Sequence, residues 1–272
     1  MDFFLVLTNQ MNVLPILIRN RFLLALWIKR DIKARYAGSV IGLVWTLILP
    51  IATIAIFYVF FALVLKVKIP ELPTTAGYFF YLLAGLLPWI SISEALNLSA
   101  NSLISQSSLL KQTVFPLEIL PAVPIFTSLL PQIFGTIIYI GLLWKFQCLE
   151  PAGLLYLPAV LAAQIVMTAG FGYLFAALCA LYRDFVQIIN VGLQLWFYVT
   201  PILYPESMVP AKFKWILLCN PLTWLTRCYQ KMFIGGQVDL KDLTASVILS
   251  VIIFLVGSAV FSLLKPGITD EL

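Results

Sequence analysis

The residue types that usually hold metals or attack substrates are scarce in this sequence of 272 residues. It has no histidine, and its four cysteines, Cys148, Cys179, Cys219 and Cys228, form no CxxC pair. Metal sites usually combine such ligands at short, regular spacings, so the sequence predicts no metal site. A disulfide between Cys219 and Cys228 stays open if both lie outside the cytoplasm, although unpaired packing is the preferred interpretation.

The sequence also lacks the residues needed to bind a nucleotide or to couple transport to an ion gradient. No GxxxxGK[ST] sequence is present, so nucleotide phosphates cannot be held in the usual loop. Glu94 and Glu118 lie near the ends of long apolar segments, and Arg183-Asp184 lies at a boundary, whereas ion-driven transporters place charges near the midplane. We interpret the glutamates as interface or capping residues and Arg183-Asp184 as a boundary pair. Any active transport must therefore draw its energy from another polypeptide.

The composition describes a chain whose main solvent is lipid. Hydrophobic residues make up 62% of the sequence and charged residues only 11%. A net charge of +5 in a soluble protein would favour nucleic acid, but here Lys and Arg flank apolar runs. We therefore expect the membrane lipid to be the partner of these charges, and no nucleic acid to bind.

The apolar segments predict an all-α integral membrane protein with six transmembrane helices. About 20 residues rising 1.5 Å each cross a hydrocarbon layer of ~30 Å. The predicted spans are 42–65, 78–96, 116–144, 154–182, 185–204 and 243–264. They form one permease domain, 42–264, between an amphipathic N-terminal region, 1–41, and a cytoplasmic tail, 265–272. We expect a short cytoplasmic helix within 97–116, and short re-entrant helices at 213–218 and 222–233.

The charge distribution predicts the orientation of the spans. Six of the 17 Lys and Arg residues precede residue 42, which favours a cytoplasmic N-terminus. An even number of spans then places both termini and the 99–111 loop in the cytoplasm, and Pro70 and Gln147 outside. Basic residues within 206–242 oppose this orientation, but longer loops obey the charge rule weakly. The N-terminus also lacks a basic region and a cleavage site, so no cleaved signal peptide is expected.

The basic segment before the first span predicts a helix that lies on the membrane surface. Ile28, Ile32 and Tyr36 share one helical face, with basic residues on the other. Gly38 and Gly42 can supply the bend into the first span, because glycine adopts backbone angles that other residues resist. Two interpretations stay open: a pure anchor in anionic lipid, or a helix that passes movement to the first span.

Four stretches, in this order, resemble permeases of the type 2 ABC transporter superfamily that export polysaccharides such as O antigen, teichoic acid or capsule. They are Asp31–Trp45 followed by Pro50, Phe115–Pro121, Tyr182–Asp184 leading to Tyr198–Pro205, and Asn220–Leu222. The resemblance covers nearly the whole chain. It implies a non-enzymatic subunit of the bacterial cytoplasmic (inner) membrane that moves a lipid-linked glycan between two copies of itself. Two copies of a separate ATPase would bind ATP and Mg, and this chain would hold no cofactor.

The resemblance also implies where the ATPase binds: on the N-terminal helix and on the loop between spans two and three. The corresponding residues here are Lys29, Arg30, Lys33, Arg35, Ser102, Ser105, Gln106 and Lys111. The segment 206–242 resembles the gate helices on the outward side of such permeases.

Aromatic residues in spans one and five are candidates for the glycan path, because sugar rings stack on aromatic faces. They are Trp45, Phe57, Tyr58, Phe61, Trp196, Phe197, Tyr198 and Tyr204. Helical spacing predicts that Phe57 and Phe61 share one face, and Phe197 and Tyr204 another. Packing in lipid is the alternative for each ring. Two other functions also stay open: an ABC permease for a small drug or a lipid, and a membrane scaffold without transport.

Overall fold

The computed structural model describes residues 13–35, 37–39, 41–65, 75–112 and 115–271, and every regular element among them is helical. This confirms the all-α prediction for the described part of the chain. Tyr36, which was predicted to lie on the apolar stripe, and Pro70, which was predicted to be external, lie outside the described residues.

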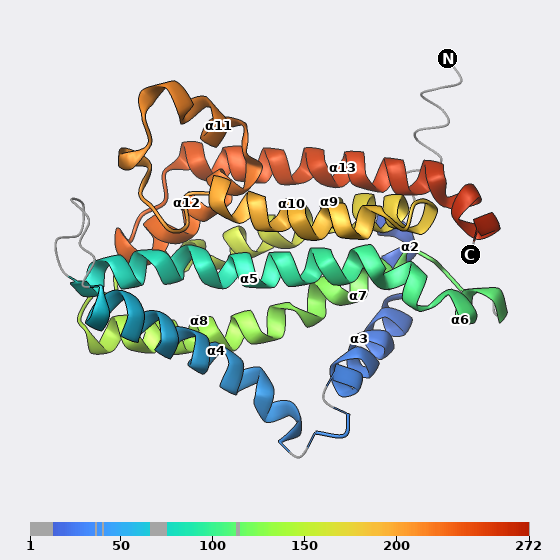
Figure 1. Cartoon of the computed structure of the whole chain (residues 1–272), viewed down its shortest axis with the longest axis horizontal. Helices are drawn as coiled ribbons and strands as arrows, with labels where there is room; N and C mark the ends of the chain where they lie inside the picture. The colour runs from blue at the N-terminus through green and yellow to red at the C-terminus, as the bar shows by residue number, and fades with distance from the viewer. Residues whose placement is uncertain (1–12, 36, 40, 66–74, 113–114, 272) are drawn as a thin grey trace.

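Long helical passes lie side by side and alternate in direction along the molecule (Figure 1). In chain order they are η1 (Gly42–Val44), α4 (Trp45–Phe57) and η2 (Tyr58–Val64); α5 (Thr75–Ser105); α7 (Ile119–Thr127) and α8 (Leu129–Lys145); η3 (Pro151–Tyr156) and α9 (Leu157–Leu181); α10 (Phe185–Val199); and α13 (Leu240–Glu271). Each pass overlaps with one of the predicted spans, although several ends differ.

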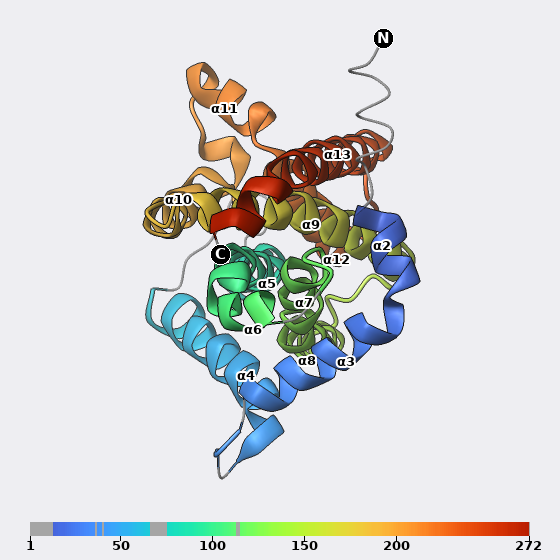
Figure 2. The same ribbon diagram turned by 90° about the vertical axis from the view of Figure 1, so that its right-hand side faces the viewer.

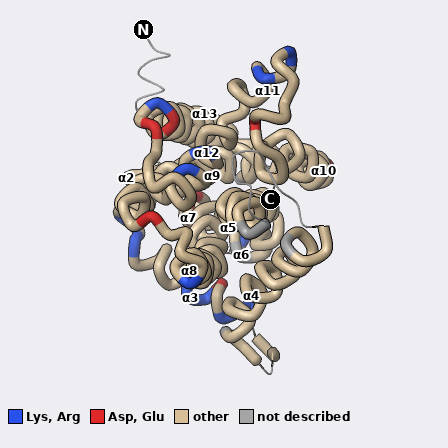
Figure 3. The backbone as a smooth tube through the Cα atoms, turned by 90° about the vertical axis from the view of Figure 1, so that its left-hand side faces the viewer, with Lys and Arg blue, Asp and Glu red and all other residues tan. Residues whose placement is uncertain are grey.

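Four of these passes are long and apolar enough to cross a membrane: Gly77–Ser105, Ile119–Lys145, Pro151–Leu181 and Leu240–Ile268. Two shorter apolar helices, Trp45–Phe61 and Phe185–Val199, correspond to the predicted first and fifth spans. Figure 3 shows how little charge the passes carry, since most of α5, α8, α9 and α13 is drawn as uncharged tube.

The remaining helices cap the two ends of the bundle. They are α2 (Val13–Arg19), α3 (Arg21–Arg35), α6 (Ser107–Gln112), η4 (Glu206–Met208), η5 (Ala211–Phe213), α11 (Lys214–Cys219) and α12 (Pro221–Ile234). In Figure 1, α6 lies at the same end as the C-terminus, whereas α11 and α12 lie toward the opposite end. The helices predicted at 213–218 and 222–233 are therefore present as α11 and α12.

Viewed along the bundle, α5 lies at the centre, with α4, α7–α8, α9 and α10 around it (Figure 2). It is the most deeply buried of the four long apolar passes. A very close crossing joins α9 to α13. A Cβ atom added to Gly257 would lie 1.9 Å from the carbonyl oxygen of Gly170, so the two backbones touch directly. Small residues permit such close approach in membrane helix pairs.

The prediction that the fifth span continues to Tyr204 is wrong, because α10 ends at Val199. Thr200 has an extended backbone with ψ 134° and precedes Pro201. A residue before proline is pushed out of the helical region, and proline itself has no N–H to donate, so the helix ends here. The predicted shared helical face of Phe197 and Tyr204 fails for the same reason.

Side chains from neighbouring helices bind the carbonyl groups of the unwound segment after α10. Tyr78 donates to the carbonyl oxygen of Leu203 at 2.7 Å, and Gln230 donates to that of Pro201 at 3.0 Å. Tyr81 adds a bond of 3.3 Å to the carbonyl oxygen of Tyr204. Irregular backbone within a membrane persists only where the protein satisfies its polar groups, and these bonds do so.

The predicted end of the second span at Leu96 is also wrong. The polar stretch from Asn97 does not start a separate helix, because α5 continues to Ser105. The hydroxyl of Ser99 donates to the carbonyl oxygen of Pro121 at 2.9 Å, so serines can pack inside the bundle. The predicted C-terminal tail is helical, because α13 continues to Glu271.

The helix predicted before the first span is longer than expected, since α3 begins at Arg21. Trp27 fixes it to the bundle, with its ring centroid 5.0 Å from that of Phe115. Gly38 (φ +77°) and Gly42 (φ +57°) adopt left-handed backbone angles between α3 and α4, which confirms their predicted role in the bend.

All four cysteines are free in the structure. Cys228 is buried, whereas Cys219 is exposed at the end of α11.

Candidate functional site

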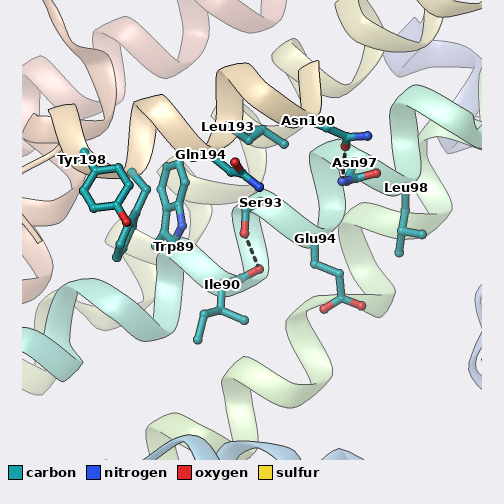
Figure 4. A pocket seen from close by; sticks show the side chains of 11 residues that line it. Trp89, Ile90, Ser93, Glu94, Asn97, Leu98, Asn190, Leu193, Gln194 and Tyr198 are labelled. Atoms are coloured by element: carbon teal, nitrogen blue, oxygen red, sulfur yellow. Dashed lines mark hydrogen bonds between the residues drawn. The ribbon is translucent and has the colours of Figure 1, made fainter. Parts of the chain in front are cut away.

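An open groove of about 1150 Å³ lies between α5 and α10 (Figure 4). Its lining repeats at intervals of three and four residues on both helices, which places the side chains on one face of each. They are Trp89, Ile90, Ser93, Glu94, Asn97 and Leu98 from α5, and Asn190, Leu193, Gln194, Phe197 and Tyr198 from α10.

One end of the groove is aromatic. The ring centroids of Trp89 and Phe197 lie 5.6 Å apart, and those of Phe197 and Tyr198 lie 5.4 Å apart. Tyr198 keeps 64% of its surface exposed, so its ring is accessible to a ligand. Trp89 of α5 is buried against Phe197, so the accessible aromatic surface of this end comes mainly from Phe197 and Tyr198 of α10.

The other end of the groove is polar but largely uncharged. The side-chain nitrogen Nδ2 of Asn97 donates to Oδ1 of Asn190 at 2.6 Å, and Figure 4 shows the two amides directed toward each other. The hydroxyl of Ser93 donates to the carbonyl oxygen of Ile90 at 3.1 Å. Gln194 is exposed beside them. Amides offer both donors and acceptors, so this end suits a hydroxyl-rich ligand.

Glu94 differs from the other polar lining residues, because its carboxylate points away from α10 (Figure 4) and forms an ion pair with Arg35 of α3. Arg35 also donates through Nε to Asp31 at 2.9 Å and through Nη2 to Thr127 at 2.7 Å. A single guanidinium therefore joins the surface helix α3 to α5 and α7. We call Arg35, Asp31, Glu94 and Thr127 the arginine hub.

A smaller cleft of about 310 Å³ lies beneath α3, on the far side of the arginine hub. Most of the residues predicted to contact an ATPase surround it: Arg30, Arg35, Ser102, Ser105 and Gln106. The other three are exposed, with Lys29 and Lys33 on α3 and Lys111 on α6. The structure thus gathers the two predicted contact segments at one end of the bundle, with Arg35 turned inward.

Of the eight aromatics predicted to line a channel, the groove holds Phe197 and Tyr198. Trp196 turns toward the bundle, where its indole N–H donates to Oδ1 of Asn220 at 2.8 Å. The hydroxyl of Tyr204 donates to the carbonyl oxygen of Tyr198 at 2.9 Å. Trp45 lies at the start of α4, away from the groove lining.

The aromatics of the first pass pack against α5 instead of lining the groove. Phe57 and Phe61 stack with centroids 5.7 Å apart, which confirms their shared face. Tyr58 contacts Phe79 at 5.2 Å and Phe61 contacts Tyr78 at 5.5 Å between ring centroids. These rings hold η2 against the start of α5.

Sequence reasoning missed most of the polar lining of the groove. The signal was a four-residue interval in both helices. It runs through Trp89, Ser93 and Asn97 on α5, and through Asn190, Gln194 and Tyr198 on α10. The sequence does not show that these positions on the two helices face each other, and only the contact between α5 and α10 brings them together.

A second group of charges, which we call the outer ion cluster, lies at the α12 end of the bundle. Arg227 pairs with Glu206 at 2.6 Å and with Asp242 at 3.6 Å, and Lys231 pairs with Asp242 at 2.6 Å. Lys231 also pairs with Asp239, and this hydrogen bond lowers the pKa of the Asp239 carboxyl. The cluster ties η4 and α12 to the start of α13.

Comparison with known proteins places this arrangement in a family. The sequence pattern of the family described as "ABC-2 type transporter" matches residues 23–234. The chain belongs to the ABC-2 type transporter family. The matched region includes most of α3, the groove between α5 and α10, and α12.

The relatives of this ABC-2 transporter have names that refer to export or transport. It is 30% identical over 244 residues to the "O-antigen export system permease protein RfbA" of Klebsiella pneumoniae, covering 89% of this chain and 92% of the relative. A protein of the same name from Myxococcus xanthus is 29% identical, with the same coverage. The "Polysialic acid transport protein KpsM" of Escherichia coli is 20% identical over 218 residues, covering 77% of this chain and 80% of the relative.

Proposed function

We propose that this chain is the permease subunit of an ATP-driven exporter that moves a lipid-linked polysaccharide of the O-antigen type across the bacterial cytoplasmic membrane. The groove between α5 and α10 is the observation that carries the proposal. It combines three aromatic rings with three amides in a chain built for lipid. The names of the most similar relatives support the same substrate class.

The energetic problem of such an exporter is a hydrated polymer in an apolar slab. Removing each hydroxyl from water without a new hydrogen bond costs several kcal/mol, roughly 2–7 per group. Aromatic rings stack on the C–H faces of sugars, while amides and trapped water bind the hydroxyls. Trp89, Phe197 and Tyr198 supply the first interaction, and Asn97, Asn190 and Gln194 supply the second.

We infer that the working assembly contains two copies of this chain and two copies of a separate ATPase that binds ATP and Mg. The exposed basic residues Lys29, Lys33 and Lys111, and the cleft beneath α3, form the surface that contacts the ATPase. Within each chain, 42–264 forms the six-span permease domain between the cytoplasmic regions 1–41 and 265–272. In this arrangement α11 and α12 are the re-entrant helices at the external end.

The function is tested by export from a strain that lacks this chain and carries a plasmid copy. We expect lipid-linked glycan to accumulate in the cytoplasm without the chain, and surface glycan to return with it. Phe197→Ala should lower export about tenfold, because it opens the ring surface between Trp89 and Tyr198. Phe254→Ala in α13, outside the groove lining, is the matched aromatic control and should retain export at equal protein level. Equal losses for both variants would place the path elsewhere, and full export without the chain would disprove the function.

The orientation of the bundle gives a second prediction. In a background with Cys148→Ser and Cys219→Ser, we expect Gln147→Cys to react with an impermeant thiol reagent added to intact cells. Ser105→Cys should react only after the cells are opened, because α5 ends on the side of the basic α3. Labelling of position 105 from outside would reverse the proposed orientation.

A further inference from the structure

The charges around the groove bear on which polysaccharide it can carry, a question that rests on the proposed function. Among the described residues that line the groove, Glu94 is the single Asp, Glu, Lys or Arg. The remaining polar lining consists of the amides Asn97, Asn190 and Gln194, with the hydroxyls of Ser93 and Tyr198. The described lining of the groove therefore offers no cation to a passing anion.

Arg35, the cation next to Glu94, already forms ion pairs within the protein. It pairs with both Asp31 and Glu94, so one positive charge faces two carboxylates in the arginine hub. Arg30 is the other arginine nearby, but it lies over the ring of Trp27 at 4.3 Å and lines the cleft beneath α3. A carboxylate on a sugar would meet a hub with a net negative charge.

The outer ion cluster, at the other end of the bundle, also contains more carboxylates than cations. Its two cations, Arg227 and Lys231, face the three carboxylates Glu206, Asp239 and Asp242. All three carboxylates pair with these cations, so neither cation is left to bind an anionic polymer. A second copy of this chain would bring the same charged groups, so the excess of carboxylates over cations would remain.

We infer that the polymer carried by this chain is uncharged along its repeat units, and that an acidic polysaccharide is excluded. An anion within an apolar slab is costly unless a cation compensates it. A polymer with one carboxylate per repeat would meet this cost repeatedly as it advances. A neutral polymer needs only stacking and hydrogen bonds, which the groove supplies.

The test compares two lipid-linked glycans of equal chain length and equal lipid, one a neutral hexose polymer and the other carrying one carboxylate per repeat. Each is added to inverted membrane vesicles that contain the permease and its ATPase. The measured quantity is the glycan protected inside the vesicles after ATP addition. We expect the neutral polymer to be transported at least about tenfold faster than the acidic one.

A lysine added to the groove should weaken this selectivity. Gln194→Lys places a cation beside the amides and should narrow the ratio of neutral to acidic transport by about threefold, the effect of one partly exposed charge pair. Gln187→Lys is the matched control, because Gln187 is an exposed glutamine of the same helix outside the groove lining. It should leave the ratio unchanged.

The outcomes separate the inference from the proposed function. Equal or faster transport of the acidic polymer overturns the inference and leaves the export function intact, as does an equal response to Gln187→Lys and Gln194→Lys. Transport of neither polymer by an assembled, ATP-hydrolysing complex overturns the proposed function and the inference together.

Discussion

Replacing Gly257 by leucine is expected to lower the stability and yield of the protein strongly, because it separates α9 and α13 where their backbones touch. A Cβ atom at this position would lie 1.9 Å from the carbonyl oxygen of Gly170, and neither backbone can yield without moving its helix. Overpacking usually costs about 1–3 kcal/mol and occasionally more, and a clash with backbone belongs at the upper end. The measurement is the yield of monodisperse protein in detergent and its thermal unfolding midpoint.

The control for this variant is Gly141→Leu. Gly141 lies in α8 with no atom within 4 Å of an added Cβ, and it is exposed on the outside of the bundle. The same change of side chain should there leave yield and midpoint close to those of the unmodified protein. If both variants behave alike, intolerance of leucine would be general, and the contact between α9 and α13 would lose its assigned importance.

The positions of the passes could be predicted from sequence because each depends on local composition. An apolar run long enough to span a membrane can be recognised within a window of about 20 residues. The left-handed backbone angles at Gly38 and Gly42 could be expected because glycine adopts such angles readily. The local sequence Thr200-Pro201 also indicates the end of α10. The prediction continued the helix through this proline and therefore placed Tyr204 wrongly on the same helical face as Phe197.

The groove and the arginine hub could not be predicted in this way, because they depend on contacts between distant segments. Glu94 and Thr127 lie 59 and 92 residues from Arg35, and no periodic pattern links them. Arg35 was predicted, together with its basic neighbours, to lie on the exposed face of the helix. Its inward turn follows from the packing of α3 across α7, which only the assembled bundle reveals.

Replacing Arg35 by alanine is expected to reduce export strongly while the protein still inserts into the membrane. The change removes the guanidinium that joins α3 to α5 and α7, and it leaves the Glu94 carboxylate without its partner. A partly buried charge that loses its partner is destabilising, largely because the remaining charge is uncompensated. We therefore expect a lower thermal unfolding midpoint and a loss of export beyond that explained by protein level.

A double-mutant cycle separates the loss of the ion pair from a general loss of the arginine. Glu94→Gln alone should be milder than Arg35→Ala, because a neutral amide needs no countercharge. In the Arg35→Ala background, Glu94→Gln should restore part of the midpoint, with a coupling energy of about 0.5–3 kcal/mol. Lys33→Ala, an exposed position on the same helix, should leave the midpoint unchanged even if it weakens ATPase binding. Strict additivity of the two changes would show that Arg35 acts through Asp31 and Thr127, and that α3 and the groove are not joined through Glu94.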